Sequence, residues 1–132
     1  MNFGYRVATE KDALRRIRRS WIKGSGQIQS VAFEPRANGN DRDGLSVSIA
    51  NDGHRELHRQ LFESDSLTAC AVVTGGVRQI GLDVLHAPEA DNPTHALITG
   101  IPDRTQGAGE NLAAAKHFAR RLSNIARPYS FD

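Results

Sequence analysis

The sequence predicts an α+β fold, a mixed or antiparallel sheet of about 4–5 strands with three main helices, in one domain spanning residues 1–132. Short runs alternate apolar and polar residues or are apolar throughout, as strands are, whereas three longer runs carry apolar residues at helical spacing. The two patterns do not alternate strictly, which favours a sheet covered by helices on one face over repeated βαβ units.

The N-terminal pattern predicts a helix over about 9–21. Thr9 followed three residues later by Asp12 resembles a capping box, and Leu14, Ile17 and Trp21 follow at helical spacing. A helix here would place its basic residues on the solvent side, namely Arg15, Arg16, Arg18 and Arg19.

Two strands are predicted next, over 28–33 and 45–49. Pro35 ends the first, because its ring restricts the preceding residue and it lacks an amide donor. Residues 36–44 contain no large apolar side chain and are rich in Gly, Asn and Asp, which predicts a surface loop. In 45–49, apolar residues alternate with serines, the pattern of a half-buried strand.

The remaining two thirds of the chain carry both kinds of pattern. Leucines at helical spacing predict a second helix over 53–63, with Asp52 as its N-cap. The later elements are a doubly buried strand over 68–73, a helical turn between 75 and 81, strands over 82–86 and 95–99, and a helix from 109 or 110 to 126 that Pro128 ends.

Composition excludes several classes of protein. The chain is 39% hydrophobic and 24% charged, as globular proteins are, and its net charge is only +2. The longest apolar stretch, residues 67–74, is too short to cross a bilayer, and the first residues lack the apolar core of a signal peptide. The single cysteine, Cys70, has apolar neighbours, which predicts a buried thiol. We expect a cytoplasmic protein without a membrane segment or cofactor.

Positive charge is concentrated near both termini and supplies the candidate binding residues, which are Arg15, Arg16, Arg19 and Arg36. Such a surface could bind nucleic-acid phosphates or an acidic protein partner. The alternative is a basic helix face that contacts only solvent. The C-terminal residues Lys116, Arg120 and Arg121 would extend it if the two helices were neighbours. The scarcity of aromatic residues argues against base stacking on a sheet.

The candidate catalytic residues are His95 and Ser46. His95 follows the Pro93-Thr94 turn near Asp91, whose carboxylate could orient the ring. Ser46 or Ser48, on the outer face of another strand, could lie nearby. These residue types suit nucleophilic hydrolysis, but a triad is recognised by geometry, and the sequence has no Gly-x-Ser-x-Gly elbow. The alternative is a structural histidine bonded to a neighbouring loop.

Three weaker motifs do not support a metal or phosphate site. His54 and His58 are four residues apart, but Glu56 is misplaced for a zinc-protease helix, so two solvated histidines are expected. Residues 41–44 start like a calcium loop without its closing Glu. Residues 107–109 lack the Gly-Lys-Ser/Thr of a phosphate-binding loop.

Three segments together resemble a family. They are 28–35, with Ala-Phe-Glu-Pro, 43–47, with Leu-Ser-Val, and 95–98, His-Ala-Leu-Ile. This pattern resembles a group of small uncharacterised bacterial proteins with Ala-Phe-x-Pro, Leu-Ser-Val and His-Ala-x-Ile segments, and it covers roughly residues 14–100. The resemblance implies a bacterial origin and no particular reaction. It draws attention to Phe33, Pro35, Ser46 and His95.

No catalytic arrangement stands out, so we expect a small cytoplasmic bacterial interaction or accessory protein that binds a larger protein partner. One alternative is a nucleotide- or RNA-directed hydrolase or transferase that uses His95. Another is a non-catalytic nucleic-acid-binding protein that uses the basic N-terminal helix.

Overall fold

A computed structural model describes residues 4–35, 43–103 and 109–131. Within them, six strands form one sheet in the order β4-β5-β2-β1-β3-β6, and every neighbouring pair is antiparallel. The strands are β1 (Asp12–Arg18), β2 (Leu45–Ile49), β3 (Leu67–Val73), β4 (Asp83–His86), β5 (His95–Thr99) and β6 (Arg127–Tyr129). The α+β class is confirmed, and the expected 4–5 strands were too few.

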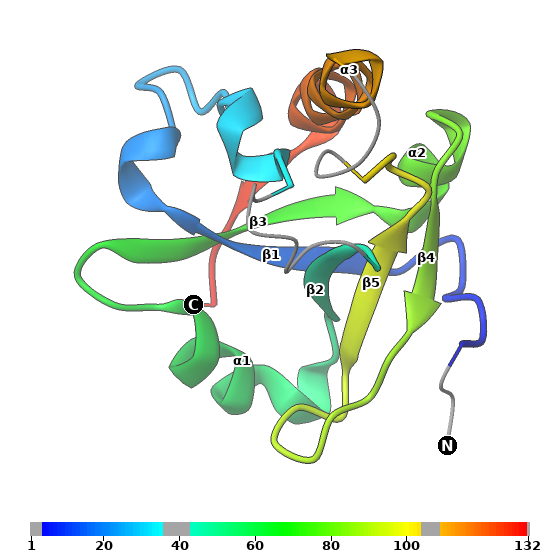
Figure 1. The fold of residues 1–132 in the computed structure, drawn as a ribbon. Helices are drawn as coiled ribbons and strands as arrows, with labels where there is room; N and C mark the ends of the chain where they lie inside the picture. The colour runs from blue at the N-terminus through cyan, green and yellow to red at the C-terminus, as the bar shows by residue number, and fades with distance from the viewer. Residues whose placement is uncertain (1–3, 36–42, 104–108, 132) are drawn as a thin grey trace.

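Helices cover both faces of the sheet, whereas the sequence predicted one covered face (Figure 1). The helices are α1 (Arg55–Phe62), α2 (Thr74–Gln79) and α3 (Gly109–Ile125), with short 3-10 helices η1 (Arg19–Trp21), η2 (Ser30–Phe33) and η3 (Asp52–His54). The larger hydrophobic core lies on the side of α3 and η2, and a smaller one around Phe62 and Phe131 lies on the side of α1. Both faces of the sheet are apolar, so helices pack on each of them and shield it from water.

The helix predicted over 9–21 is wrong, because this stretch forms β1 and then η1. Ile17 is buried in the larger core and Leu14 in the smaller one, so β1 is apolar on both faces. A spacing of three residues fits one helix face, but it equally fits opposite faces of a doubly buried strand. Pairing with β3 along the whole of β1 decides the outcome.

The other elements are mostly where the sequence places them. Six elements lie within about two residues of their predicted positions, namely β2, β3, β4, β5, α2 and α3. Residues 30–33 are a 3-10 helix in place of most of the strand predicted over 28–33. Asn51, not Asp52, supplies the capping oxygen before α1, accepting from the Gly53 amide at 2.8 Å. The strand β6 was missed because Pro128 was taken as a stop signal, although it lies within β6 opposite Cys70.

Among the described residues, no helix combines the length and apolarity needed to span a bilayer.

Gly44 fixes how the chain enters β2. Its φ is +147°, which L side chains rarely adopt, and a Cβ there would lie 2.6 Å from the Ile98 carbonyl oxygen. We expect Gly44→Ala to lower the free energy of unfolding by about 1–3 kcal/mol, through strain and displacement of β5. Urea denaturation measures this loss.

Gly24→Ala is the matched control, because a Cβ at Gly24 meets no atom within 4 Å. Its midpoint should be unchanged or slightly raised. Equal losses in both variants would contradict this account of Gly44.

Candidate functional site: a cleft where two central strands separate

The site arises because β1 and β2 are paired over only part of their length. They pair at Ala13↔Ile49 and Leu14↔Ser48, and no further pair follows among the described residues. Beyond this point β2 stays paired with β5, and β1 with β3. The two strands therefore separate within the sheet, and a cleft of about 640 Å³ opens between them.

Arg15 bridges the inner end of this cleft. Its Nη1 donates to the Ser46 carbonyl at 2.9 Å, and its Nε donates to the Ala32 carbonyl of η2 at 2.7 Å. In a continuous ladder the Ser46 carbonyl would accept from the Arg16 amide instead, as the register shows. The guanidinium thus replaces a missing backbone bond with charge-assisted ones.

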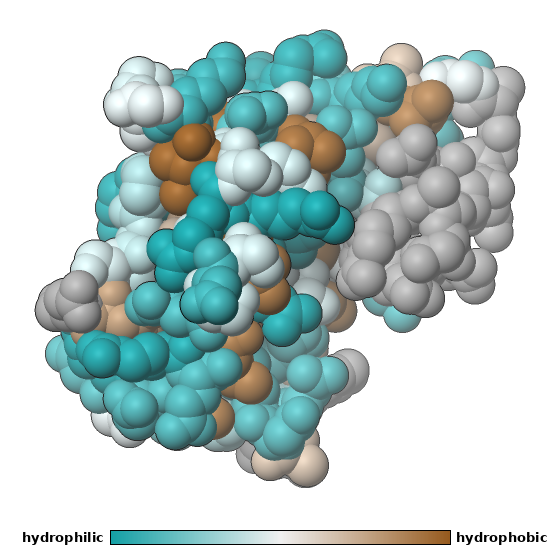
Figure 2. Space-filling model, turned by 90° about the vertical axis from the view of Figure 1, so that its left-hand side faces the viewer, coloured by the Kyte–Doolittle hydropathy of each residue, from teal (hydrophilic) through white to brown (hydrophobic). Residues whose placement is uncertain are grey.

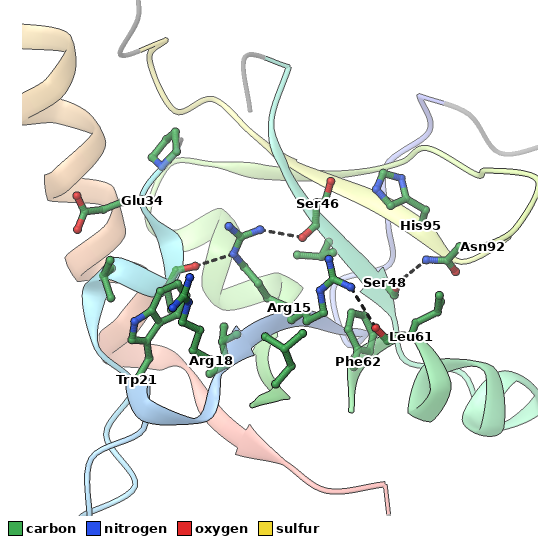
Figure 3. Close-up of a pocket in the computed structure, with 17 residues that line it drawn as sticks. Arg15, Arg18, Trp21, Glu34, Ser46, Ser48, Leu61, Phe62, Asn92 and His95 are labelled. Atoms are coloured by element: carbon green, nitrogen blue, oxygen red, sulfur yellow. Dashed lines mark hydrogen bonds between the residues drawn. The ribbon is translucent and has the colours of Figure 1, made fainter. Parts of the chain in front are cut away.

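The walls of the cleft come from both faces of the sheet (Figure 3). Arg16 and Arg18 line it from β1 and Trp21 lines it from η1, while Leu61 and Phe62 line it from α1. Polar side chains from β2 and β5 face them across the opening. A ligand here would meet cationic, aromatic and polar groups together.

Among the lining residues that the structure describes, three are arginines and one, Glu34, carries a carboxylate. Arg16 is exposed and makes one long hydrogen bond, 3.4 Å from Nη1 to the Leu61 carbonyl. Arg18 is exposed, and its guanidinium carbon lies 5.7 Å from the Trp21 ring centroid. Within the described residues, neither arginine has a carboxylate at ion-pair distance, whereas Arg19 pairs with Glu63 at 3.5 Å.

A chain of hydrogen bonds orients the polar wall. Thr94 Oγ1 donates to Asn92 Oδ1 at 3.0 Å, and Asn92 Nδ2 donates to Ser48 Oγ at 2.7 Å. Because the Thr94 hydrogen is used, its oxygen accepts from His58 Nε2 at 2.7 Å. Ser48 is therefore an acceptor toward Asn92, and its own hydroxyl hydrogen remains available to another acceptor.

His95 lines the same cleft, and its ring is bonded to a neighbouring loop, as the structural interpretation predicted. Nδ1 lies 2.8 Å from the Ala87 carbonyl, so Nδ1 carries a hydrogen. The carboxylate within ion-pair range of Nε2 is that of Glu89, at 3.8 Å, and not that of Asp91. In the neutral ring, Nε2 therefore keeps its lone pair.

Ser46 and His95 both line the cleft, but they form no nucleophile–base pair. Ser46 is opposite Leu97, and His95 is opposite Ser48. Diagonal neighbours of this kind lie about 7–8 Å apart, beyond direct proton transfer. No hydrogen bond joins their side chains in the described structure.

The thiol of Cys70 is no alternative nucleophile. Cys70 is completely buried on β3, as the sequence predicted. Burial raises the pKa of Cys70 to about 12, and the positive charge of Arg15 offsets only part of this effect. A nucleophilic cysteine needs the opposite shift.

The predicted basic helix face is also wrong. Arg15 is half-buried and holds the cleft together, Arg16 lines it, and Arg19 bonds the Ser64 carbonyl outside it. Arg36 lies outside the described residues, as do most of the predicted 36–44 loop and Gly107. Arg120 of α3 lines a different, shallow hollow together with Lys23.

The His54–His58 pair is not the solvated pair that was expected. His58 is buried and bonded to Thr94, and its ring centroid lies 6.3 Å from that of His54. No group of three or more metal-ligating side chains occurs within the part of the chain that the structure describes.

Trp21 and Asn92 are among the cleft residues that were not predicted. Trp21 was assigned to the apolar face of a helix, and Asn92 was not singled out. The one available signal was the only tryptophan of the chain following a run of arginines, a combination that is common at binding surfaces.

No family model, curated protein or solved structure matches this chain. The resemblance to small bacterial proteins stays a prediction, and a functional assignment rests on the cleft itself.

The buried histidine makes stability depend on pH. Burial, with a smaller contribution from the charge of His54, lowers the pKa of His58 below its usual 6.5. The unfolded chain then takes up this proton at higher pH than the folded protein, so stability should fall as pH drops below about 6.5. One histidine contributes at most about 1.4 kcal/mol per pH unit.

Urea midpoints at pH 7.5 and 5.5 measure this dependence. His58→Gln should flatten it, because the replacement keeps a donor for Thr94 and does not titrate. His117→Gln, at an exposed position on α3, is the matched control and should retain the wild-type slope. An unchanged slope in His58→Gln would contradict the assignment.

Proposed function

We propose that the protein is a non-catalytic interaction or accessory module that binds an acidic segment of a larger protein partner in the cleft between β1 and β2. The supporting observation is that Arg16 and Arg18 line this cleft without a carboxylate at ion-pair distance among the described residues. Arginine binds carboxylates through two parallel hydrogen bonds, which gives both strength and orientation.

The charge balance of the cleft favours an anionic ligand. Among the described lining residues, three arginines accompany one glutamate, and apolar side chains of η2 and α1 exclude water from part of the walls. Attraction between charges is stronger where water is partly excluded than on an open surface.

The aromatic and apolar lining favours a protein ligand. Tryptophan and arginine are enriched where proteins bind one another, and Trp21 with Arg18 supplies both at one point. The face in Figure 2 shows only small hydrophobic patches separated by hydrophilic side chains. Such a face suits polar recognition in a cleft better than docking through one broad apolar surface.

Trp21 is the only tryptophan in the chain, so its fluorescence reports directly on the cleft. We expect tetraglutamate to change this fluorescence saturably and tetraglutamine not to. Arg16→Gln and Arg18→Gln should each weaken binding about two- to fivefold, because one exposed charge pair contributes roughly 0.2–1 kcal/mol. Raising the salt concentration should weaken it further.

Arg121→Gln removes the same charge from the exposed face of α3 and is the matched control, so its affinity should equal that of the wild type. Equal binding of both peptides, or equal loss in all three variants, would overturn the proposal.

A second candidate is a nucleotide- or RNA-directed hydrolase or transferase. The observation in its favour is that His95, with its Nε2 lone pair, lines the same cleft as the arginines that would bind phosphates. The absence of a hydrogen-bonded nucleophile in the described cleft weighs against it. Nucleic-acid binding without catalysis would use the same arginines, now on a strand.

Incubation with RNA oligonucleotides and nucleoside triphosphates, analysed by mass spectrometry, separates these functions. We expect no turnover by the wild type or by His95→Ala. If the wild type turns over one of these substrates, and His95→Ala loses this activity while keeping the wild-type urea midpoint, the enzyme becomes the favoured function.

A further inference from the structure

We infer that the acidic segment binds as an added strand, antiparallel to β1, with its acidic residues opposite Arg16 and Arg18. This inference rests on the proposed function and specifies how the ligand is recognised. Strand addition of this kind combines main-chain hydrogen bonds with specificity from alternate side chains.

The backbone of β1 presents unpaired groups to the cleft. The Thr74 amide donates to the Lys11 carbonyl and the Arg19 amide to the Ser66 carbonyl, so the odd-numbered residues face β3. The Ala50 amide donates to the Asp12 carbonyl, so the even-numbered residues face β2. Backbone groups alternate along an antiparallel strand, which directs those of Arg16 and Arg18 into the cleft.

These groups have no backbone partner among the described residues, because the β1–β2 ladder ends at Leu14↔Ser48. The outer edges of the sheet are less available. The edge of β4 is covered by the N-terminal segment, where the Val7 amide donates to the Val84 carbonyl and the His86 amide to the Tyr5 carbonyl. The short β6 carries Pro128. The accessible strand edge is thus the internal one, beside the arginines.

The alternation of side chains along β1 predicts the order of acidic and apolar residues in the ligand. Arg16 and Arg18 point to one face of β1, and the buried Ile17 between them points to the other. A paired strand places two residues opposite the arginines on their face and the residue between them on the side of Ile17 and Val31. The preferred ligand is therefore acidic–apolar–acidic.

Charge decides between this ligand and a second copy of the chain. Pairing two β1 edges would bring the arginines of one copy against those of the other, and like charges directly opposite one another are destabilising. Charged residues on an exposed edge commonly prevent such self-association. An acidic strand turns the same charges into an attraction.

Two peptides of identical composition test the pattern. Acetyl-Ser-Glu-Val-Glu-Val-Glu-Ser-amide has alternating acids, whereas acetyl-Ser-Glu-Glu-Val-Val-Glu-Ser-amide has no two acids that are two residues apart. Titration of Trp21 fluorescence should show at least about fivefold tighter binding of the alternating peptide, because only that peptide can place acids opposite both arginines.

Backbone methylation tests the strand. In antiparallel pairing, the residues opposite Arg16 and Arg18 exchange both hydrogen bonds with them, so the amides of the glutamates face β1. N-methylation of the glutamate amides should weaken binding at least tenfold. N-methylation of the two valine amides, which face away from β1, is the matched control and should have a smaller effect.

The outcomes separate the two proposals. If tetraglutamate and both heptapeptides fail to bind, the proposed function fails. If acidic peptides bind through Arg16 and Arg18 but neither the order of residues nor methylation matters, the acidic cleft stands and strand addition is overturned. A greater loss from valine methylation than from glutamate methylation would overturn the antiparallel register.

Discussion

The hydrogen bonds from the Arg15 guanidinium to the Ser46 and Ala32 carbonyls connect β1, β2 and η2 at the point where the two central strands separate. Without them, the carbonyl of Ser46 would face a cleft with no donor, and an unsatisfied polar group at a half-buried position is costly. With them, β1 and β2 can separate without breaking the sheet, and η2 is tied to the same point. Hydrogen bonds within the fold therefore stabilise the separation of the two strands that forms the cleft.

Everything that lines the cleft depends on that separation. On one side, β1 stays fully paired with β3, so Arg16 and Arg18 are held on a rigid strand and point to the same face. On the other side, the bonds from His58 through Thr94 and Asn92 fix the hydroxyl of Ser48. Because these walls are already ordered, the protein itself loses little conformational entropy on binding. The proposed acidic ligand would therefore meet preformed walls.

The sequence predicted an element correctly where its apolar residues fit either strand alternation or helical spacing, but not both. Alternation in β2 and the long apolar face of α3 have a single interpretation, and both elements were predicted. Leu14 and Ile17 fit either a helix face or two faces of a strand, and only pairing with β3, more than fifty residues away, distinguishes them. The cleft could not be predicted for the same reason. His95 and Ser46 were singled out by residue type and do line it, but Trp21 and Asn92 reach it only through the tertiary fold.

Cys70 has a practical consequence that follows from its position between β1 and β6. Burial raises the pKa of Cys70 to about 12, so the thiol is protonated at neutral pH, and the residue is completely buried. Alkylating reagents and disulfides can reach it only when the centre of the sheet opens. The chain therefore contains a natural single-site reporter, and the rate at which this thiol is labelled measures how often β3 separates from its neighbours.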